Sequence, residues 1–530
     1  MGIDRFIYRW RNELFAGVLS GLLLAFSFPP YPARFLSCIA LVPVFRFFIT
    51  PTDSAADRRG VIRMGLVTGF AFGLSFFTLL LFWIVNLIPA SSVKIPWILT
   101  PALILLVLYL SCYPALSFIA IHFLRKRYGG VALLGVPAVW SVFELARSSG
   151  ELGFSWGIVS NSLVTYPMAI QGASVYGPYG LSFVVVLVNM LLALVLFGRG
   201  KGNRILALAG LVFVTCAHLG FGHYRINSYD RKMNEGNGLM KVAVVQPNVD
   251  LAIKWNPAYR DSIFSKIEIL TLKSAANGAE VVIFPETSAP ISLSYSPEYG
   301  ERLEMLSRTS GVDLLVGYIY HTSINNSIQS YNSAGMFDSS GRLITQYHKV
   351  NLLPFGERIP FSQYIPALSR LKFGQANFEA GTLQPLFRSK AGPFGVLICF
   401  ESTFSDFARR YVRDGADFLV NITNDGWFGS ERGPLQHTET AVLRSVENGV
   451  PLLRSANTGI SMIVDPLGRV ERHIGLDREG LLLADIGRPL RRTPYCKYGN
   501  LIFYIMVLSS LAAVPLGQAI RRCGRKVRLR

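Results

Sequence analysis

Long apolar runs are the feature that most limits how this chain can fold. A helix needs roughly 20 mostly apolar residues to cross the hydrocarbon core of a bilayer, which is about 30 Å thick. Runs near that length occur at about residues 14–29, 35–50, 65–88, 97–124, 131–145, 181–198, 205–221 and 500–519. With 51% hydrophobic and 16% charged residues, the chain is too apolar for a soluble protein of several domains. The runs therefore predict a multi-pass α-helical membrane domain of about eight spans.

Basic residues are distributed unevenly among the connections between these spans. Arg and Lys cluster at residues 5–11, 58–63, 125–127, 199–204 and 521–530. The alternate short loops hold only Arg34, Lys94 and Arg147. Because cytoplasmic loops carry an excess of Lys and Arg, both termini are predicted to be cytoplasmic. The basic tail could bind nucleic acid, but beside a span its charge is better explained as a topology signal, so we expect no nucleic-acid partner.

One long segment, between the seventh and eighth runs, is less apolar. An odd number of spans precedes it, so residues 223–498 are predicted to lie outside the cytoplasm, and they suffice to bury a core of their own. The predicted organisation is a membrane domain of seven helices in 1–222, an external domain in 223–498, and a final helix with a basic cytoplasmic tail in 499–530. The first run lacks a small-residue cleavage site, so we expect it to be retained.

The external segment has the pattern of an α/β domain. Short apolar runs typical of buried strands occur at 241–248, 280–287, 312–320, 395–401 and 416–424. Apolar residues recur at helical spacing in 260–277 and 438–448, and alternating strands and helices indicate an α/β fold. Reactive groups in such folds gather where strands end, and Glu286, Cys399 and Asn424 stand at three predicted strand ends.

Cys399 is the one cysteine of six that falls in the heart of the external domain. A thiol attacks a carbonyl well only as a thiolate, so it needs a base and a donor for the oxyanion that follows. Glu286, after "VVIFP", is a candidate base, although alone it could equally be a helix cap or a surface charge. Lys349 and Glu357 lie in the largely apolar loop "HKVNLLPFGERIP", where a lone lysine is usually solvated but two charges suggest a tethered site.

Taken together, "VVQPN", "FPET", "HKVNLLPFGE", "ICFE" and "NDGWFG" resemble the nitrilase superfamily, in which Glu, Lys and Cys follow in this order. The match covers about residues 241–485. With spans on both sides, the chain is similar to the membrane-bound acyltransferase branch of that superfamily, and "FPPYP" and "GFSW" (153–156) resemble it too. The resemblance implies an αββα sandwich on the outer face of a bacterial inner membrane. It also implies no cofactor and no metal.

The resemblance further implies a reaction. An acyl chain would pass from a phospholipid, through a thioester on Cys399, to the α-amino group of the diacylglyceryl-cysteine that begins an apolipoprotein. Glu286 would act as base and Lys349 would hold the oxyanion. The residues expected to support substrate or catalytic groups are Glu357, Glu401, Trp255, Phe400, Asn424 and Trp427. Phe400 stands where a tyrosine often follows the nucleophile, and the segment around Asn424 could line the pocket or simply turn the chain.

Two other functions remain open at this stage. The same triad permits a membrane-bound amidase or lipid hydrolase that uses water, and a transporter with an external binding domain is a further possibility, although its spans should hold more ionisable groups. His437 could suggest a metal ligand, but no second His or Cys lies nearby, so a hydrogen-bonding role near a helix start is favoured. Glu144 and Arg147, spaced i and i+3, are expected to form an interfacial pair, although an intramembrane acid is also a functional candidate.

Overall fold

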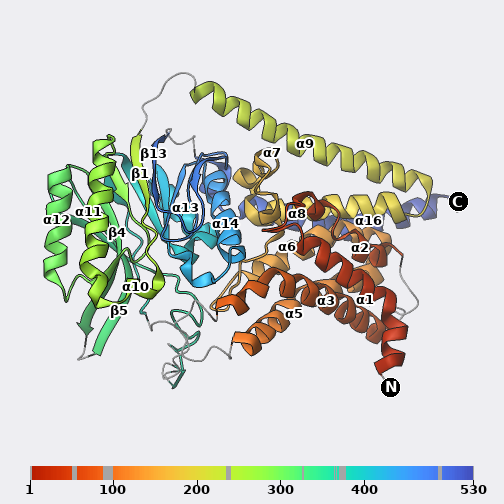
Figure 1. Ribbon diagram of the computed structural model, residues 1–530. Helices are drawn as coiled ribbons and strands as arrows, with labels where there is room; N and C mark the ends of the chain where they lie inside the picture. Colours follow the sequence, from red (N-terminus) through yellow and green to blue (C-terminus); the bar gives the residue numbers. More distant parts are fainter. Residues whose placement is uncertain are drawn as a thin grey trace. The chain divides into compact units, whose positions relative to one another are not determined.

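The structure is a computed structural model that describes residues 3–50, 57–87, 99–233, 240–324, 327–362, 364–365, 367–368, 378–486 and 492–528. The chain divides into two compact units (Figure 1). The helical unit contains Met1–Val85, Ile98–Arg225 and Tyr498–Arg530, and the second unit contains Asn86–Trp97 and Ile226–Lys497. Long helices make up the first unit, whereas two β-sheets form the centre of the second.

The helical unit is built from long apolar helices joined by short 3₁₀ turns. Its helices are α1 (Ile3–Ala25), α2 (Val42–Ile49), α3 (Arg58–Leu81), α5 (Leu99–Tyr128), α6 (Val136–Arg147), α7 (Pro167–Ile170), α8 (Ala173–Phe197), α9 (Lys201–Met233) and α16 (Leu501–Arg528). Glycines let α3 approach α5 closely: a Cβ atom on Gly69 would lie 2.3 Å from Cα of Ala115, and one on Gly73 would lie 2.7 Å from Cα of Ser111. Such small-residue contacts are typical of helices that pack within a membrane.

Five described helical stretches, rather than the eight predicted spans, are long and apolar enough to cross a membrane. They are Arg58–Asn86, Leu99–Arg147, Ala173–Phe197, Lys201–Arg231 and Leu501–Arg521. The second predicted span corresponds to the 3₁₀ turn Arg34–Cys38 and to α2, which has eight residues and rises about 12 Å. The fifth corresponds to the 12 residues of α6, which continue the Leu99–Arg147 stretch. The first predicted span, 14–29, begins within α1, after the charged residues Arg11 and Glu13.

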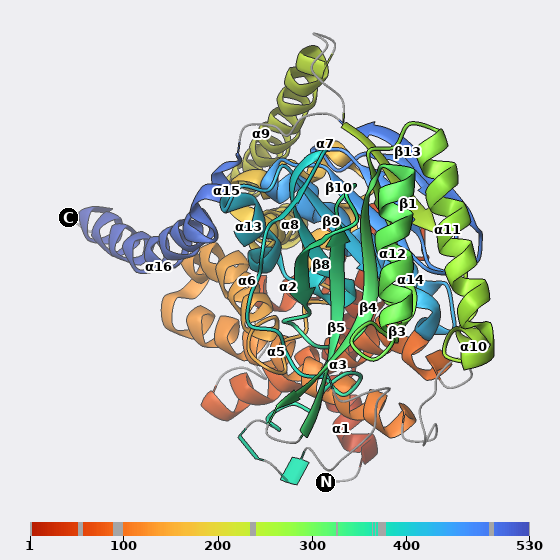
Figure 2. The same ribbon diagram turned by 90° about the vertical axis from the view of Figure 1, so that its left-hand side faces the viewer.

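The second unit contains a seven-stranded sheet with the order β13-β1-β2-β4-β5-β6, in which β3 pairs with β4. Its strands are β1 (Met240–Gln246), β2 (Val281–Ile283), β3 (Ala289–Ser292), β4 (Asp313–Ile324), β5 (Ser327–Phe337), β6 (Leu343–His348) and β13 (Gly480–Ile486). Strands β1, β2 and β4 are parallel neighbours. Helices α11 (Arg260–Ala276) and α12 (Pro297–Ser310) cover one face of this sheet, with Phe264 and Leu303 in the shared apolar core (Figure 2).

A six-stranded sheet with the order β12-β11-β10-β9-β8-β7 faces the first. Its strands are β7 (Phe387–Ser389), β8 (Gly392–Ile398), β9 (Phe418–Thr423), β10 (Leu452–Ala456), β11 (Ser461–Val464) and β12 (Val470–Ile474). Helices α13 (Ser405–Arg413) and α14 (Arg432–Asn448) pack on its outer face. The Ser455 hydroxyl joins the sheets by donating to the carbonyl of Val245, at 2.8 Å. The predicted αββα sandwich is confirmed, and Figure 1 shows its four layers.

Candidate active site

Three polar side chains follow strands of the two sheets. Glu286 comes three residues after β2, Lys349 directly follows β6, and Cys399 directly follows β8. Glu286 and Lys349 are buried, with 6% and 1% of their surfaces exposed, and Cys399 is half-buried. Strands β2 and β8 are apolar and largely buried, so polar residues begin only where each of them ends, whereas β6 is an edge strand with exposed residues at its start.

Cys399 occupies a sharp turn between β8 and the short 3₁₀ helix Cys399–Thr403. Its φ angle of 51° lies in the left-handed region, which residues with a Cβ atom rarely adopt and which recurs at functional sites. Its carbonyl oxygen accepts a hydrogen bond from the Ser402 hydroxyl at 3.0 Å. This turn sets the direction of the Cys399 side chain at the end of the strand.

Lys349 lies between two carboxylates. Its Nζ atom is 2.8 Å from Oε2 and 2.9 Å from Oε1 of Glu357, and 3.6 Å from Oε1 of Glu286. The other carboxylate oxygen of Glu286 accepts the backbone N–H of Asn424 at 2.9 Å. The structure thus brings together Glu286, Asn424 and the loop residues Lys349 and Glu357, which lie in three separate segments of the sequence.

Electrostatics keep this lysine charged and the thiol protonated. Burial alone lowers the pKa of Lys349, but the carboxylates of Glu357 and Glu286 outweigh burial and raise the pKa above its ordinary value. Burial raises the pKa of the Cys399 thiol, and Glu286 raises it further, whereas Lys349 opposes the increase. The site therefore holds a thiol, an ammonium group and carboxylates in one cluster. Such a cluster can support general-base activation of the thiol and stabilisation of an oxyanion.

Glu401 lies two residues after the cysteine and holds neighbouring backbone in place. Its Oε1 atom accepts the Tyr347 hydroxyl at 2.6 Å and the backbone N–H groups of Val350 and Asn351 at 2.8 and 3.0 Å, and its Oε2 atom accepts the N–H of Ile398 at 2.8 Å. Burial raises the pKa of Glu401 to about 7. Its bonds therefore tie the segment that follows Lys349 to the turn that carries the cysteine.

The remaining predicted residues differ in their surroundings. Trp255 is 40% exposed and follows the short helix α10 (Leu251–Lys254). Trp427 is half-buried. With the side-chain oxygen of Asn424 turned toward the indole, the indole N–H of Trp427 donates to that oxygen at 3.3 Å. Phe400 is buried and packs edge-on against Phe404, with ring centroids 5.0 Å apart. Its contacts are those of a core residue.

His437, which the sequence suggested as a hydrogen bonder near a helix start, lies directly behind the cysteine. Its Nε2 atom is 3.1 Å from the carbonyl oxygen of Cys399, and its Nδ1 atom is 3.0 Å from Oδ1 of Asp425. Arg454 donates to the other oxygen of Asp425 at 2.7 Å. Burial raises the pKa of Asp425, but Arg454 and His437 outweigh it and lower the pKa to about 2. No pattern in the sequence predicted that α14 would pack beside the turn that carries Cys399.

Two further polar residues of the site were missed from the sequence. Lys254 is 2% exposed and donates to the carbonyl oxygen of Glu286 at 3.2 Å. Burial lowers the pKa of Lys254 to about 7, partly opposed by Glu286. Asn332, on β5, donates from Nδ2 to Oε1 of Glu286 at 2.6 Å. Lys254 is adjacent to the predicted Trp255, whereas Asn332 sits in a strand and had no distinguishing motif.

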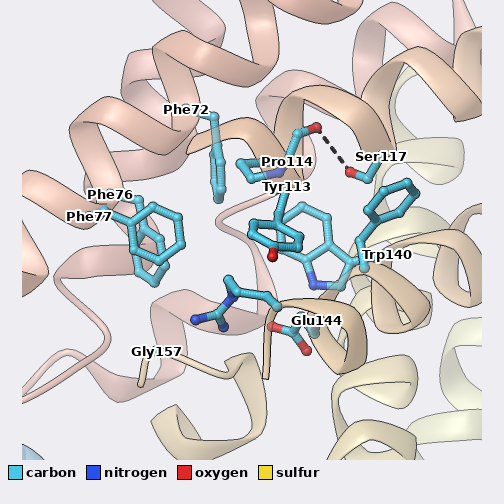
Figure 3. Close-up of a pocket in the computed structure, with 11 residues that line it drawn as sticks. Phe72, Phe76, Phe77, Tyr113, Pro114, Ser117, Trp140, Glu144 and Gly157 are labelled. Carbon is cyan, nitrogen blue, oxygen red and sulfur yellow. Dashed lines mark hydrogen bonds between the residues drawn. The ribbon is translucent and has the colours of Figure 1, made fainter. Parts of the chain in front are cut away.

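The helical unit contains a pocket with aromatic walls (Figure 3). It is lined by side chains of α3, α5 and α6 that include Phe76, Tyr113 and Trp140, with Glu144 at its edge. Glu144 and Arg147 are both buried, and each binds backbone: Glu144 accepts the N–H of Val159, whereas Arg147 donates to the carbonyls of residues 154 and 156. Arg147 thus ties the segment 153–156 to α6.

Comparison with known proteins identifies both units. The carbon-nitrogen hydrolase family matches residues 241–493, and the apolipoprotein N-acyltransferase N-terminal domain matches residues 20–191. An apolipoprotein N-acyltransferase of Geobacter metallireducens is 33% identical over 97% of this chain and 96% of its own length, and that of Brucella melitensis is 31% identical over 96% of each. An amidase structure from Nesterenkonia sp. covers 51% of this chain and 96% of its own, with 19% identity and a TM-score of 0.38. The chain therefore belongs to the apolipoprotein N-acyltransferase family, as a membrane enzyme of the carbon-nitrogen hydrolase superfamily.

Proposed function

We propose that this protein transfers a fatty acyl chain from a phospholipid to the α-amino group of the N-terminal diacylglyceryl-cysteine of apolipoproteins, through a thioester on Cys399. One observation carries the proposal. A cysteine on a strained turn shares a buried cluster with Glu286 and Lys349, in a chain that aligns along nearly its whole length with enzymes named apolipoprotein N-acyltransferase.

In the first half-reaction, the carboxylate of Glu286 takes the proton from the thiol of Cys399. The sulfur attacks the carbonyl carbon of the sn-1 ester, and the ammonium group of Lys349 stabilises the tetrahedral oxyanion. The carbon–oxygen bond to the glycerol then breaks, and the leaving oxygen receives the proton from Glu286. A lysophospholipid departs and the acyl group stays on Cys399 as a thioester.

In the second half-reaction, the neutral α-amine of the acceptor attacks the thioester carbonyl. Glu286 takes a proton from the attacking nitrogen, and Lys349 again faces the oxyanion. The carbon–sulfur bond breaks, and Glu286 returns the proton to the sulfur. An amide is formed and the enzyme regains its starting state. Glu357 keeps the ammonium group of Lys349 in place, because it binds Nζ with both oxygens at 2.8 and 2.9 Å.

The proposal includes a membrane orientation. Residues 1–222 are assigned to the membrane domain, 223–498 to a catalytic domain on the periplasmic side of the bacterial inner membrane, and 499–530 to a final helix with a cytoplasmic tail. The uneven distribution of Lys and Arg supports this orientation. Both proposed substrates are lipids, and moving an acyl chain into water costs about 0.8 kcal/mol per CH₂. A catalytic domain joined to membrane helices avoids that cost.

Intact-protein mass spectrometry tests the reaction. The purified protein, incubated with phospholipid but no acceptor, should gain the mass of one acyl group, and Cys399→Ala should gain none. A diacylated lipopeptide should then discharge the enzyme and become N-acylated, whereas a lipopeptide with a blocked α-amine should leave the thioester intact. Steady release of free fatty acid without acceptor, and no mass gain on the lipopeptide, would identify a lipid hydrolase that uses water instead.

A further inference from the structure

The amide of Asn332 spans the two carboxylates of the active site. Its Nδ2 atom donates to Oε1 of Glu286 at 2.6 Å and to Oε1 of Glu357 at 3.0 Å. Both hydrogens of one NH₂ group are therefore used, one for each carboxylate. Asn332 is 3% exposed and lies on β5, where its backbone carbonyl also accepts the N–H of Lys349 at 2.8 Å. One residue on β5 thus contacts both carboxylates and the backbone of the lysine between them.

The orientation of this amide is set by the carboxylates. If the amide were turned over, its oxygen would face both Glu286 and Glu357, which are acceptors when ionised. In the present orientation Oδ1 is buried and has no hydrogen-bond partner among the described residues. A buried, unpaired carbonyl oxygen is destabilising. The amide therefore donates hydrogen bonds to both carboxylates while its own oxygen stays unpaired. Such an unpaired buried polar atom is typical of a functional site.

The charges around the amide explain why two donors are needed. Glu286 and Glu357 carry two negative charges, and Lys349 supplies one positive charge between them. Carboxylates that share a buried site repel each other, so that one of them tends to take up a proton. The Cys399 thiol interacts electrostatically with Glu286, and Lys254 donates to the backbone carbonyl of Glu286; neither group is an anion before the reaction begins. Donors that bridge the two carboxylates favour the form in which both are ionised.

We propose that Asn332 is a positioning residue for acyl transfer, which holds Glu286 in place as the base by bridging it to Glu357. The inference rests on the proposed function for the identity of the reaction. It goes beyond the three residues Glu286, Lys349 and Cys399, because it explains how the base remains a base next to a second buried carboxylate. Asn332 acts through Glu286.

Two substitutions make opposite predictions for the pH dependence of Cys399 acylation by phospholipid between pH 5 and 8. Asn332→Asp keeps the shape but can donate only while its carboxyl is protonated, so its rate relative to wild type should fall as pH rises, by up to about tenfold per pH unit for one required proton. Asn332→Leu removes both donors, so the repulsion between the two carboxylates is no longer offset and the variant should need a higher pH to reach the same rate. Its relative rate should therefore rise with pH.

Gln329→Glu is the matched control, because it changes an amide to a carboxyl on the same strand, and Gln329 contacts Tyr331. Its relative rate should not vary with pH. Thermal unfolding of each variant reports loss of the fold, and Asn332→Asp, being nearly isosteric, keeps the test available if Asn332→Leu does not fold. The proposal is wrong if the acylation rate of Asn332→Asp relative to wild type does not vary with pH. It is also wrong if the relative rates of Asn332→Asp and Gln329→Glu vary with pH in the same way.

A second probe separates this inference from the proposed function. Alkylation of Cys399 by iodoacetamide needs the base but no lipid, so the same opposite slopes are expected for Asn332→Asp and Asn332→Leu. If wild type reacts with iodoacetamide but forms no acyl-enzyme with phospholipid, the proposed acyl transfer fails and the alkylation slopes still decide the role of Asn332. If the relative alkylation rates of Asn332→Asp and Asn332→Leu change with pH in the same direction, Asn332 does not have that role.

Discussion

Nζ of Lys349 lies 3.6 Å from Oε1 of Glu286, a longer separation than its contacts of 2.8 and 2.9 Å with Glu357. The ammonium group is therefore anchored mainly by Glu357. The ammonium group of Lys349 is close enough to stabilise the carboxylate of Glu286. Unlike Glu357, however, Glu286 does not bind this ammonium group with both of its oxygens. This asymmetry suits the roles proposed for the three residues, because a base must exchange protons while an oxyanion donor must stay fixed.

Lys349→Ala should slow acylation of Cys399 strongly. Loss of one oxyanion donor typically lowers the rate by about 10²- to 10³-fold. Single-turnover acylation with phospholipid, followed by intact-protein mass spectrometry, measures the rate. Lys390→Ala, which removes an exposed ammonium group bonded to the carbonyl of Gly311, is the control and should react normally. Near-normal acylation in Lys349→Ala would remove this residue from the mechanism.

His437→Ala should slow acylation without preventing folding, because the imidazole holds the carbonyl of Cys399 at a strained turn. His437→Gln keeps a side-chain donor and should recover part of the rate. We expect a loss of roughly tenfold for alanine, since one hydrogen bond contributes about 0.5–1.5 kcal/mol. Iodoacetamide labelling of Cys399 provides a second readout. Equal rates for the alanine and glutamine variants would show that the hydrogen bond to the carbonyl has no role.

Lys254→Met should change stability in a pH-dependent manner. The pKa of Lys254 falls from 10.5 to about 7 on burial. Below pH 7 the lysine is charged in both states, so the folded protein bears the full penalty of a buried ammonium group. Between pH 7 and 10.5 only the unfolded lysine is protonated, and the penalty fades as pH rises. Methionine removes the penalty, so the Tm of the variant minus that of wild type should be more positive at pH 6 than at pH 9.

The control for this measurement is Lys273→Met, at an exposed position of α11, whose Tm difference should not change with pH. A Lys254→Met difference that is constant from pH 6 to pH 9 would mean that Lys254 titrates near its ordinary pKa.

The proposed orientation predicts which residues an impermeant thiol reagent can reach. Single cysteines at Ser294 and Val527, introduced as Ser294→Cys and Val527→Cys after removal of the other accessible thiols, should differ in intact spheroplasts. Ser294 is exposed in the second unit, on the proposed periplasmic side, and should be labelled. Residue 527 is in the basic tail and should be labelled only after lysis. Labelling at 527 alone would reverse the orientation and the compartment of the site.

Much of the site was predictable because strand ends can be recognised locally. Apolar runs that stop at a polar residue predicted β2, β8 and β9, and the residues at or near their ends include Glu286, Cys399 and Asn424. Lys349 was a candidate because charged residues are unusual in an apolar loop. The number of spans was less predictable. Hydropathy does not show where a helix stops, and the second predicted span proved to be a 3₁₀ turn followed by the eight residues of α2.

The sequence by itself determined the composition of the two units, the α/β class of the second, and the candidate nucleophile, base and cation, because each depends on local pattern. Only the tertiary structure decided that Asn332, Lys254 and His437 belong to the site. Asn332 reaches Glu286 across 46 positions and His437 reaches Cys399 across 38, by pairing of strands and packing of a helix on a sheet. Such contacts arise from non-local hydrogen bonding and burial, which local periodicity does not encode.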